Sequence, residues 1–170
     1  VKASVFIEMI PPQFHLAIYG DNYDVYPILE MAKLMDWDVS LVGNVQKLKK
    51  EKLQSVKNIY PKDLKERPVI DNQTAVILMA HDYKTDYANL HKLIKSTAPY
   101  IASLGPRKRF DKMLSEFKVN GIELTKQEID RVFAPCGFLL ISSIFLLYRN
   151  LKLSAPFPKN ILLTLSCNLI

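Results

Sequence analysis

The chain has 170 residues, of which 49% are hydrophobic and 24% charged, and these values are typical of a single globular domain with its own core. Its formal net charge of +6 permits attraction to phosphates or acidic partners without demonstrating it. The two cysteines, Cys136 and Cys167, lie far apart and form no C-x-x-C motif, so they suggest neither a zinc site nor a disulfide framework, and we expect a reducing, cytoplasmic compartment.

The first predicted element is a strand at residues 4–10, which ends at Pro11 and Pro12 because proline cannot continue a strand ladder. The N-terminus lacks the basic region, apolar run and cleavage site of a signal peptide. The apolar start at Val1, without an initiator methionine, suggests a fragment of a longer polypeptide.

The segment from residue 14 to residue 42 has the pattern of a nucleotide-type βαβ unit. Residues 14–19 read as a buried strand that stops at Gly20, and Asp24 is in position to cap the helix that follows. The helix is indicated by apolar residues at helical spacing, which are Val25, Ile28, Leu29, Ala32 and Met35. Residues 39–42 form the next predicted strand.

The rest of the chain continues to alternate strands and helices. The predicted elements are a lysine-rich helix at 46–53, strands at 56–60, 74–80 and 100–104, a helix from Asp86, a helix at 107–117, and a short helix after a Thr125/Glu128 capping box with Ile129, Val132 and Phe133 inward. We interpret the lysines of 47–57 as a solvated helix face. The alternation predicts an α/β fold, a doubly wound and mainly parallel sheet with helices on both faces. The tail after Arg131 contains no acidic residue and is too short and interrupted to predict a membrane span.

Three loops that follow predicted strands should meet at the carboxyl edge of the sheet, where open α/β folds bind ligands. The predicted binding residues are Gly20, Asp21, Asn22, Tyr23, Asp24, His81, Asp82, Gly105, Pro106 and Arg107. Gly20 and Gly105 offer close backbone approach to a phosphate, and Arg107 offers a guanidinium fork. His81 can exchange hydrogen bonds with a ligand at neutral pH, with Asp82 orienting it. A turn requirement at Gly20 and a structural hydrogen bond at His81 are the competing interpretations.

Ordinary dinucleotide binding is disfavoured by two features. Only the first glycine of G-x-G-x-x-G is present, and the end of the second strand reads Val42-Gly43-Asn44 where a ribose-binding carboxylate is expected. An NAD(P)-dependent oxidoreductase or another nucleotide-binding module remains the alternative. Nucleic-acid binding is disfavoured because aromatic residues are not interleaved with the basic cluster.

Two motifs together carry a resemblance to a known family. They are Met79-x-His81-Asp82 and Ala98-Pro99-Tyr100-Ile101-x-x-Leu104-Gly105-Pro106-Arg107, and they accompany the Gly20 turn with its Asp24. With these segments the chain resembles the C-terminal Rossmann domain of the XdhC/CoxI family, the xanthine dehydrogenase accessory proteins. The resemblance implies a Rossmann-like domain at residues 1–137, with 1–13 as a leading strand or linker, and leaves 138–170 as an atypical apolar tail.

The resemblance also implies a function. Proteins of this family bind the molybdenum cofactor (molybdopterin), act as its chaperone, and deliver it to a molybdenum hydroxylase, so we expect no catalytic residues and a cofactor-insertion role rather than an enzyme. The partners implied are a xanthine dehydrogenase-type molybdoenzyme, a cysteine desulfurase and a second copy of the chain, with no membrane. Asn22 departs from the pattern, because it replaces the second glycine of the family's turn.

Overall fold

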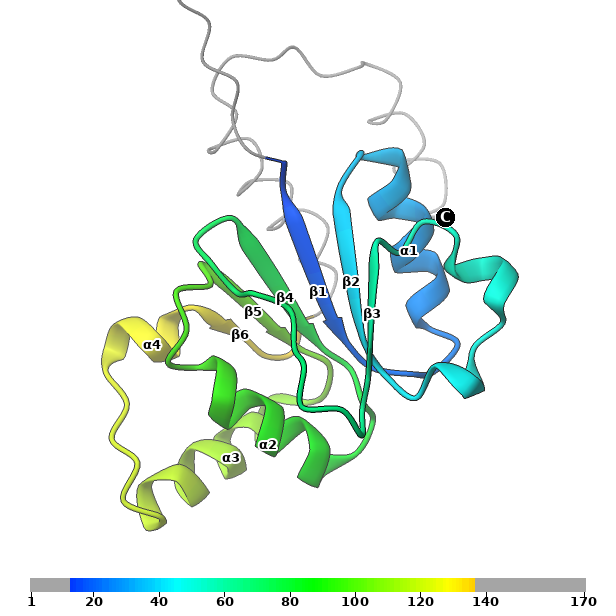
Figure 1. Cartoon of the computed structure of the whole chain (residues 1–170). Helices are drawn as coiled ribbons and strands as arrows, with labels where there is room; N and C mark the ends of the chain where they lie inside the picture. The colour runs from blue at the N-terminus through cyan, green and yellow to red at the C-terminus, as the bar shows by residue number, and fades with distance from the viewer. Residues whose placement is uncertain (1–12, 137–170) are drawn as a thin grey trace, which may run out of the picture.

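The computed structural model describes residues 13–136, and the predicted strand at 4–10 and the tail from 138 lie outside this range. Within the described residues, six strands form one parallel sheet in the order β3-β2-β1-β4-β5-β6 (Figure 1). They are β1 (His15–Tyr19), β2 (Asp38–Gly43), β3 (Asn58–Pro61), β4 (Thr74–Leu78), β5 (Tyr100–Ser103) and β6 (Val132–Phe133). From β1 the chain adds β2 and β3 on one side of the sheet, and it then adds β4, β5 and β6 on the other side. The predicted doubly wound parallel sheet is therefore confirmed, with its switch point between β1 and β4.

Helices cover both faces of this sheet because successive strand residues point to opposite sides. In β1, Leu16 and Ile18 pack in one core cluster with α1 (Val25–Leu34), whereas Ala17 and Tyr19 belong to a second cluster. The second cluster includes side chains of α2 (Tyr83–Leu93) and α3 (Arg107–Val119), which lie together on the other face (Figure 1). The carboxyl ends of the neighbouring strands β1 and β4 therefore lead to helices on opposite faces of the sheet, α1 after β1 and α2 after β4.

The lysine-rich segment does not form the single helix predicted at 46–53. It makes two short 3₁₀ turns, η1 (Val45–Lys47) and η2 (Lys50–Leu53), and Leu48 and Leu53 pack into the α1-side core. Both leucines reach the core without a continuous α-helix. The run of lysines alone therefore did not predict the secondary structure of this segment.

Two helix starts also differ from the prediction. Asp24 occupies the N-cap position of α1, but its side chain caps no backbone N–H group. The next helix, α2, begins at Tyr83 instead of Asp86, because Asp82 accepts a hydrogen bond from the backbone N–H of Thr85 at 2.8 Å. Asp86 is then inside the helix and fully buried.

The C-terminal part of the described chain confirms one prediction and corrects another. The capping box is present at the start of α4 (Lys126–Asp130), where Thr125 and Glu128 each accept from the other's backbone N–H. Val132 and Phe133, predicted as inward residues of that helix, instead form β6 beside β5, and Phe133 is 38% exposed. Among residues 13–136, no helix is long and apolar enough to span a membrane.

Candidate functional site

The loops after β1 and β4 are joined directly at the switch point. His81 follows β4 with a positive φ of 59°, a backbone conformation that residues with side chains rarely adopt, and its Nε2 contacts a carboxylate oxygen of Asp24. This contact connects the start of α1 to the turn before α2. The two loops therefore lie side by side at one edge, as the sequence predicted.

Gly20 allows these two strand ends to pack tightly. A Cβ atom at Gly20 would lie 2.6 Å from the backbone oxygen of Met79, which no relaxed structure tolerates. The same holds at the end of β2, where a Cβ on Gly43 would lie 2.8 Å from the backbone oxygen of Gly20. The geometry thus accounts for Gly20 by the close packing of the two strand ends, a reason that the sequence did not suggest beside the turn requirement and the phosphate contact.

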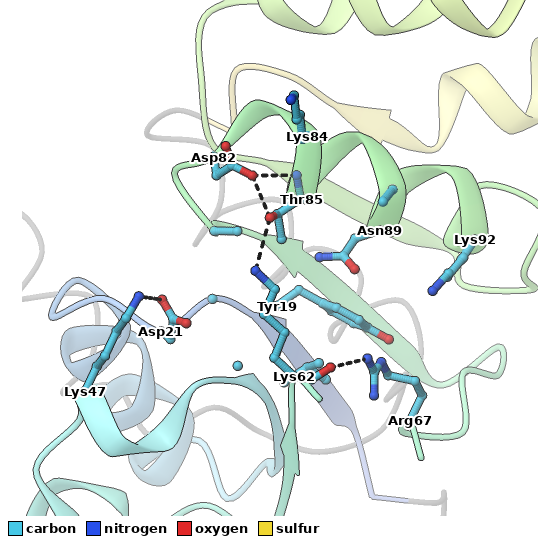
Figure 2. A pocket seen from close by; sticks show the side chains of 15 residues that line it. Tyr19, Asp21, Lys47, Lys62, Arg67, Asp82, Lys84, Thr85, Asn89 and Lys92 are labelled. Carbon is cyan, nitrogen blue, oxygen red and sulfur yellow. Dashed lines mark hydrogen bonds and ion pairs between the residues drawn. The ribbon is translucent and has the colours of Figure 1, made fainter. Parts of the chain in front are cut away.

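A cavity of about 420 Å³ opens beside this edge, between β1, α2 and the connection from β3 to β4 (Figure 2). Its lining is rich in cationic side chains, which are Lys47, Lys62, Arg67, Lys84 and Lys92. Only two carboxylates of the described residues, Asp21 and Asp82, line it with them. The cavity therefore has an excess of positive charge.

Both carboxylates already have partners. Asp21 accepts from the backbone N–H of Asn44 at 3.0 Å and pairs with the Lys47 ammonium at 3.4 Å. Hydrogen bonds from the Thr85 hydroxyl and backbone N–H lower the pKa of Asp82 below its usual value, so this carboxylate stays ionised while it caps α2.

The other four cationic side chains that line the cavity form no ion pair with a carboxylate of the described residues. Within the described part of the chain, no carboxylate lies within 4.0 Å of the charged groups of Lys62, Arg67, Lys84 or Lys92. Arg67 is held in place by backbone carbonyls, including that of Lys62 at 3.1 Å. Lys62 in turn reaches the Thr85 hydroxyl at 3.4 Å. This arrangement suits a bound anion such as a phosphate group.

Tyr19 forms the floor of the cavity at the end of β1. Its side chain comes from the face of the sheet that α2 covers, and the residue is only 4% exposed. Burial raises the pKa of Tyr19 to about 12, so its hydroxyl remains protonated at neutral pH. The floor is therefore an aromatic ring with a neutral hydrogen-bonding group at its tip.

The structure brings only some of the predicted site residues to this cavity. Gly20, Asp21 and Asp82 line it. Asn22, Tyr23, Asp24 and His81 lie in the adjoining loops but do not line it, and the Tyr23 side chain, 82% exposed, does not fill it.

The third predicted loop lies one strand further along, at the end of β5, and Gly105, Pro106 and Arg107 do not line the cavity. Arg107 is exposed and pairs with Asp111 at 3.0 Å on the same helix. The guanidinium that turns inward is that of Arg109, which packs against Gly105 and pairs with Asp86. Arg107 therefore lies away from this cavity, whose cationic lining comes from other residues.

Sequence reasoning missed Lys62, Arg67, Lys84 and Lys92, and it dismissed Lys47 as part of a solvated helix face. Lys62 and Arg67 lie in a connection without regular structure, where periodicity gives no signal. Lys84 and Lys92 are eight residues apart in α2, a spacing that places them on nearby faces of a helix and could have drawn attention to them. No group of three or more His, Cys, Asp or Glu residues within 13–136 is arranged to hold a metal ion.

Comparison with known proteins identifies the family. Residues 16–143 match the family model described as the XdhC Rossmann domain. No curated protein matches the sequence. Among solved structures, the chain is similar to a protein described as a xanthine dehydrogenase from Bacillus halodurans, with a TM-score of 0.68 and 20% identity. The match covers 86% of this chain and 46% of that one, so the chain spans about half the length of its structural relative, and at this identity the likeness shows the fold alone. Because the family model covers well over half of the sequence, the chain belongs to the XdhC Rossmann domain family.

Proposed function

We propose that this chain is the cofactor-handling domain of an XdhC-type accessory protein, which binds the molybdenum cofactor and assists its maturation or insertion into a molybdenum hydroxylase. The observation that carries the proposal is the cavity at the switch point, where four cations without carboxylate partners among the described residues surround an aromatic floor. In this role its partners are a xanthine dehydrogenase-type enzyme and a cysteine desulfurase, and the chain can act as a homodimer.

The residues present fit an organic ligand that carries a phosphate. A volume of about 420 Å³ lies within the range of small-molecule sites in proteins. The pterin of the molybdenum cofactor bears a terminal phosphate, and Lys62, Arg67 and Lys92 are the groups that would hold it. When bound, the cofactor supplies the metal and its sulfur chemistry, whereas the chain's own residues bind and orient the organic part.

The carboxylates near α1 explain why the phosphate would not bind as it does in dinucleotide enzymes. In those enzymes the pyrophosphate lies at the N-terminus of the first helix. Here Asp24 occupies that terminus and contacts His81, while Asp21 occupies the space between the glycine turn and the end of β2. The Asp24 carboxylate at this helix start repels an anion, whereas the cations without carboxylate partners among the described residues lie on the α2 side.

The test is a titration of the chain with the fluorescent, oxidised derivative of molybdopterin that keeps its phosphate. Replacing Lys62 or Lys92 by Met removes one charge-assisted hydrogen bond and should weaken binding about 10-fold or more. Lys108→Met is the matched control, because Lys108 is exposed on α3 and does not line the cavity. Equal losses in all three variants, or no binding by the wild type, would refute the proposal. NAD(P) released from the denatured protein would favour the oxidoreductase alternative.

A further inference from the structure

A second hollow continues the basic cavity along α2. It has a volume of about 280 Å³ and shares Tyr19, Arg67, Asn89 and Lys92 with the basic cavity. Its remaining walls are formed mainly by apolar side chains, which are Pro68, Ile70 and Leu93, with Ser96 at the far end. The two hollows therefore join at Tyr19, with a cationic part on one side and an apolar part on the other.

Tyr19 is the second observation that points to a ligand. Only 4% of the residue's surface is exposed, yet its hydroxyl has no hydrogen-bond partner among the described residues. Figure 2 shows this side chain lying across the cavity with its hydroxyl end near Arg67. The hydroxyl opens onto the cavity, so an acceptor atom of a ligand bound there can pair with it.

We infer that the two hollows form a single site for a phosphorylated heterocycle, with the phosphate among Lys62, Arg67 and Lys92 and the ring in the apolar part beyond Tyr19. The Tyr19 hydroxyl donates to an acceptor atom of the ring or its linker. This inference rests on the proposed function, and it deepens it by placing the ring on the α2 side of the sheet.

The apolar part explains why a ring is expected in addition to an anion. Pro68 and Leu93 are buried and Ile70 is half-buried, so together they offer a dry wall that a free phosphate would not use. Asn89, which faces both hollows from α2, adds an amide able to donate and accept in the plane of a heterocycle. A pterin phosphate and a mononucleotide share this chemistry, and the experiment separates them.

The experiment compares three probes on the full chain by calorimetry: the phosphorylated molybdopterin derivative, its dephosphorylated form, and inorganic phosphate. GMP and CMP form a separate arm for the nucleotide source. The informative variants are Tyr19→Phe, which removes only the hydroxyl, and Ile70→Trp, which fills the apolar part. Val69→Trp is the matched control, because Val69 is the neighbouring residue and is 79% exposed.

We expect the wild type to bind the phosphorylated ring compound more tightly than either the dephosphorylated ring or inorganic phosphate. Tyr19→Phe should weaken that binding about 5- to 10-fold, the effect of one hydrogen bond. Ile70→Trp should weaken it about 10-fold or more while leaving inorganic phosphate binding unchanged, and Val69→Trp should have no effect.

The outcomes distinguish this inference from the proposed function. If the pterin phosphate binds but neither Tyr19→Phe nor Ile70→Trp alters its affinity, the cofactor proposal stands and the two-part site is overturned. If mononucleotides bind with both variant effects and pterins do not, the two-part site stands and the molybdenum-cofactor function fails. If inorganic phosphate competes as well as any ring compound, the inference is overturned. Circular dichroism of each variant checks that the fold is retained.

Discussion

The carboxylate of Asp86 and the guanidinium of Arg109 form an ion pair at 3.0 Å, in which the carboxylate is buried and the arginine is partly exposed. Asp86 is fully buried, and its second oxygen accepts from the backbone N–H of Ala80 at 3.0 Å. Burial raises the pKa of Asp86, while the Ala80 N–H and Arg109 oppose this shift. The pair thus fastens α3 to the turn that carries His81, beside the candidate site.

Arg109→Met should destabilise the protein strongly, because it leaves the buried Asp86 carboxylate without its counter-charge. Breaking a buried pair in this way typically costs about 3–5 kcal/mol of unfolding free energy. Urea denaturation measures the effect. The control is Arg107→Met, whose exposed pair with Asp111 should contribute less than about 1 kcal/mol. Similar losses in the two variants would contradict the structural role given to Arg109.

Gly20→Ala should also be destabilising, since the added Cβ would meet both the backbone oxygen and the Cγ of Met79 at 2.6 Å. Relieving this overlap requires the ends of β1 and β4 to separate, at a cost of about 1–3 kcal/mol or more.

A matched glycine separates this packing effect from backbone strain. Gly121 has a φ of +72°, but nothing lies within 4 Å of the position that a Cβ would occupy there. Gly121→Ala therefore tests strain alone and should cost only about 1 kcal/mol. Thermal or urea unfolding of both variants is the measurement. A smaller loss for Gly20→Ala than for Gly121→Ala would show that the two strand ends are not closely packed.

His15 should make the stability of the protein depend on pH. Its ring is bonded at Nε2 to the Ser40 hydroxyl at 2.8 Å and at Nδ1 to the Thr74 hydroxyl at 3.2 Å, and burial lowers its pKa from the ordinary value. The folded state therefore binds a proton less readily than the unfolded chain does. As pH falls through the unfolded value of about 6.5, protonation favours unfolding and stability decreases.

The variant His15→Gln removes this titration. Its free energy of unfolding should change less than that of the wild type between about pH 7.5 and about pH 5. His91→Gln, at an exposed position on α2, is the control and should keep the wild-type dependence. An unaltered pH profile in His15→Gln would show that this partly buried imidazole does not control stability in this range.

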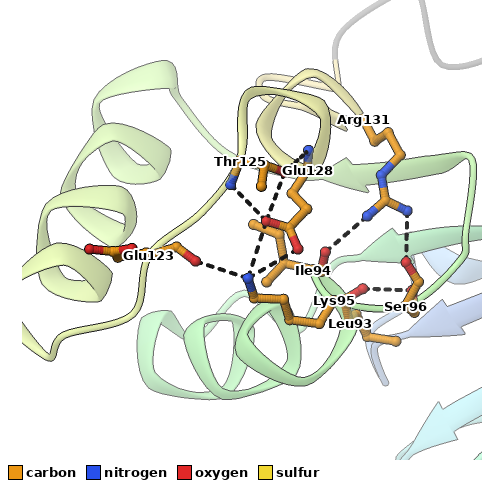
Figure 3. A network of polar contacts seen from close by, with 8 residues as sticks. All are labelled: Leu93, Ile94, Lys95, Ser96, Glu123, Thr125, Glu128 and Arg131. Carbon is orange, nitrogen blue, oxygen red and sulfur yellow. Dashed lines mark hydrogen bonds and ion pairs between the residues drawn. The ribbon is translucent and has the colours of Figure 1, made fainter.

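Arg131 ties the end of α2 to the C-terminal part of the described chain (Figure 3). Its guanidinium donates to the carbonyl oxygens of Ile94 at 3.0 Å, Ser96 at 2.8 Å and Ala98. Arg131→Met removes all three bonds and should lower the unfolding free energy by about 2–4 kcal/mol. The neighbouring Lys95, an exposed residue paired with Glu128, provides the comparison, and Lys95→Met should cost about 1 kcal/mol or less. Equal costs for the two variants would contradict this role for Arg131.

Local patterns in the sequence determined most of the fold. The apolar runs of β1 and β4 and the helical spacing in α1 and α3 each depend on residues close together in the chain, so periodicity alone predicts these elements and a parallel sheet. The Thr125/Glu128 capping box was predicted for the same reason, because both of its partners lie within one helical turn.

The composition of the candidate site was decided by the tertiary structure. The sequence placed the correct loops at one edge, but it could not choose between Arg107 and Arg109, since two positions in a helix differ by more than half a turn and only packing shows which one faces inward. Lys62 and Arg67 reach the cavity from an irregular connection, and Tyr19 reaches its floor through the alternation of a strand whose two faces are both buried. Contacts between segments distant in the chain produce no periodic pattern in the sequence. The sequence therefore predicted the edge of the sheet where the site lies, and the packing of α2 against the sheet determined which side chains meet there.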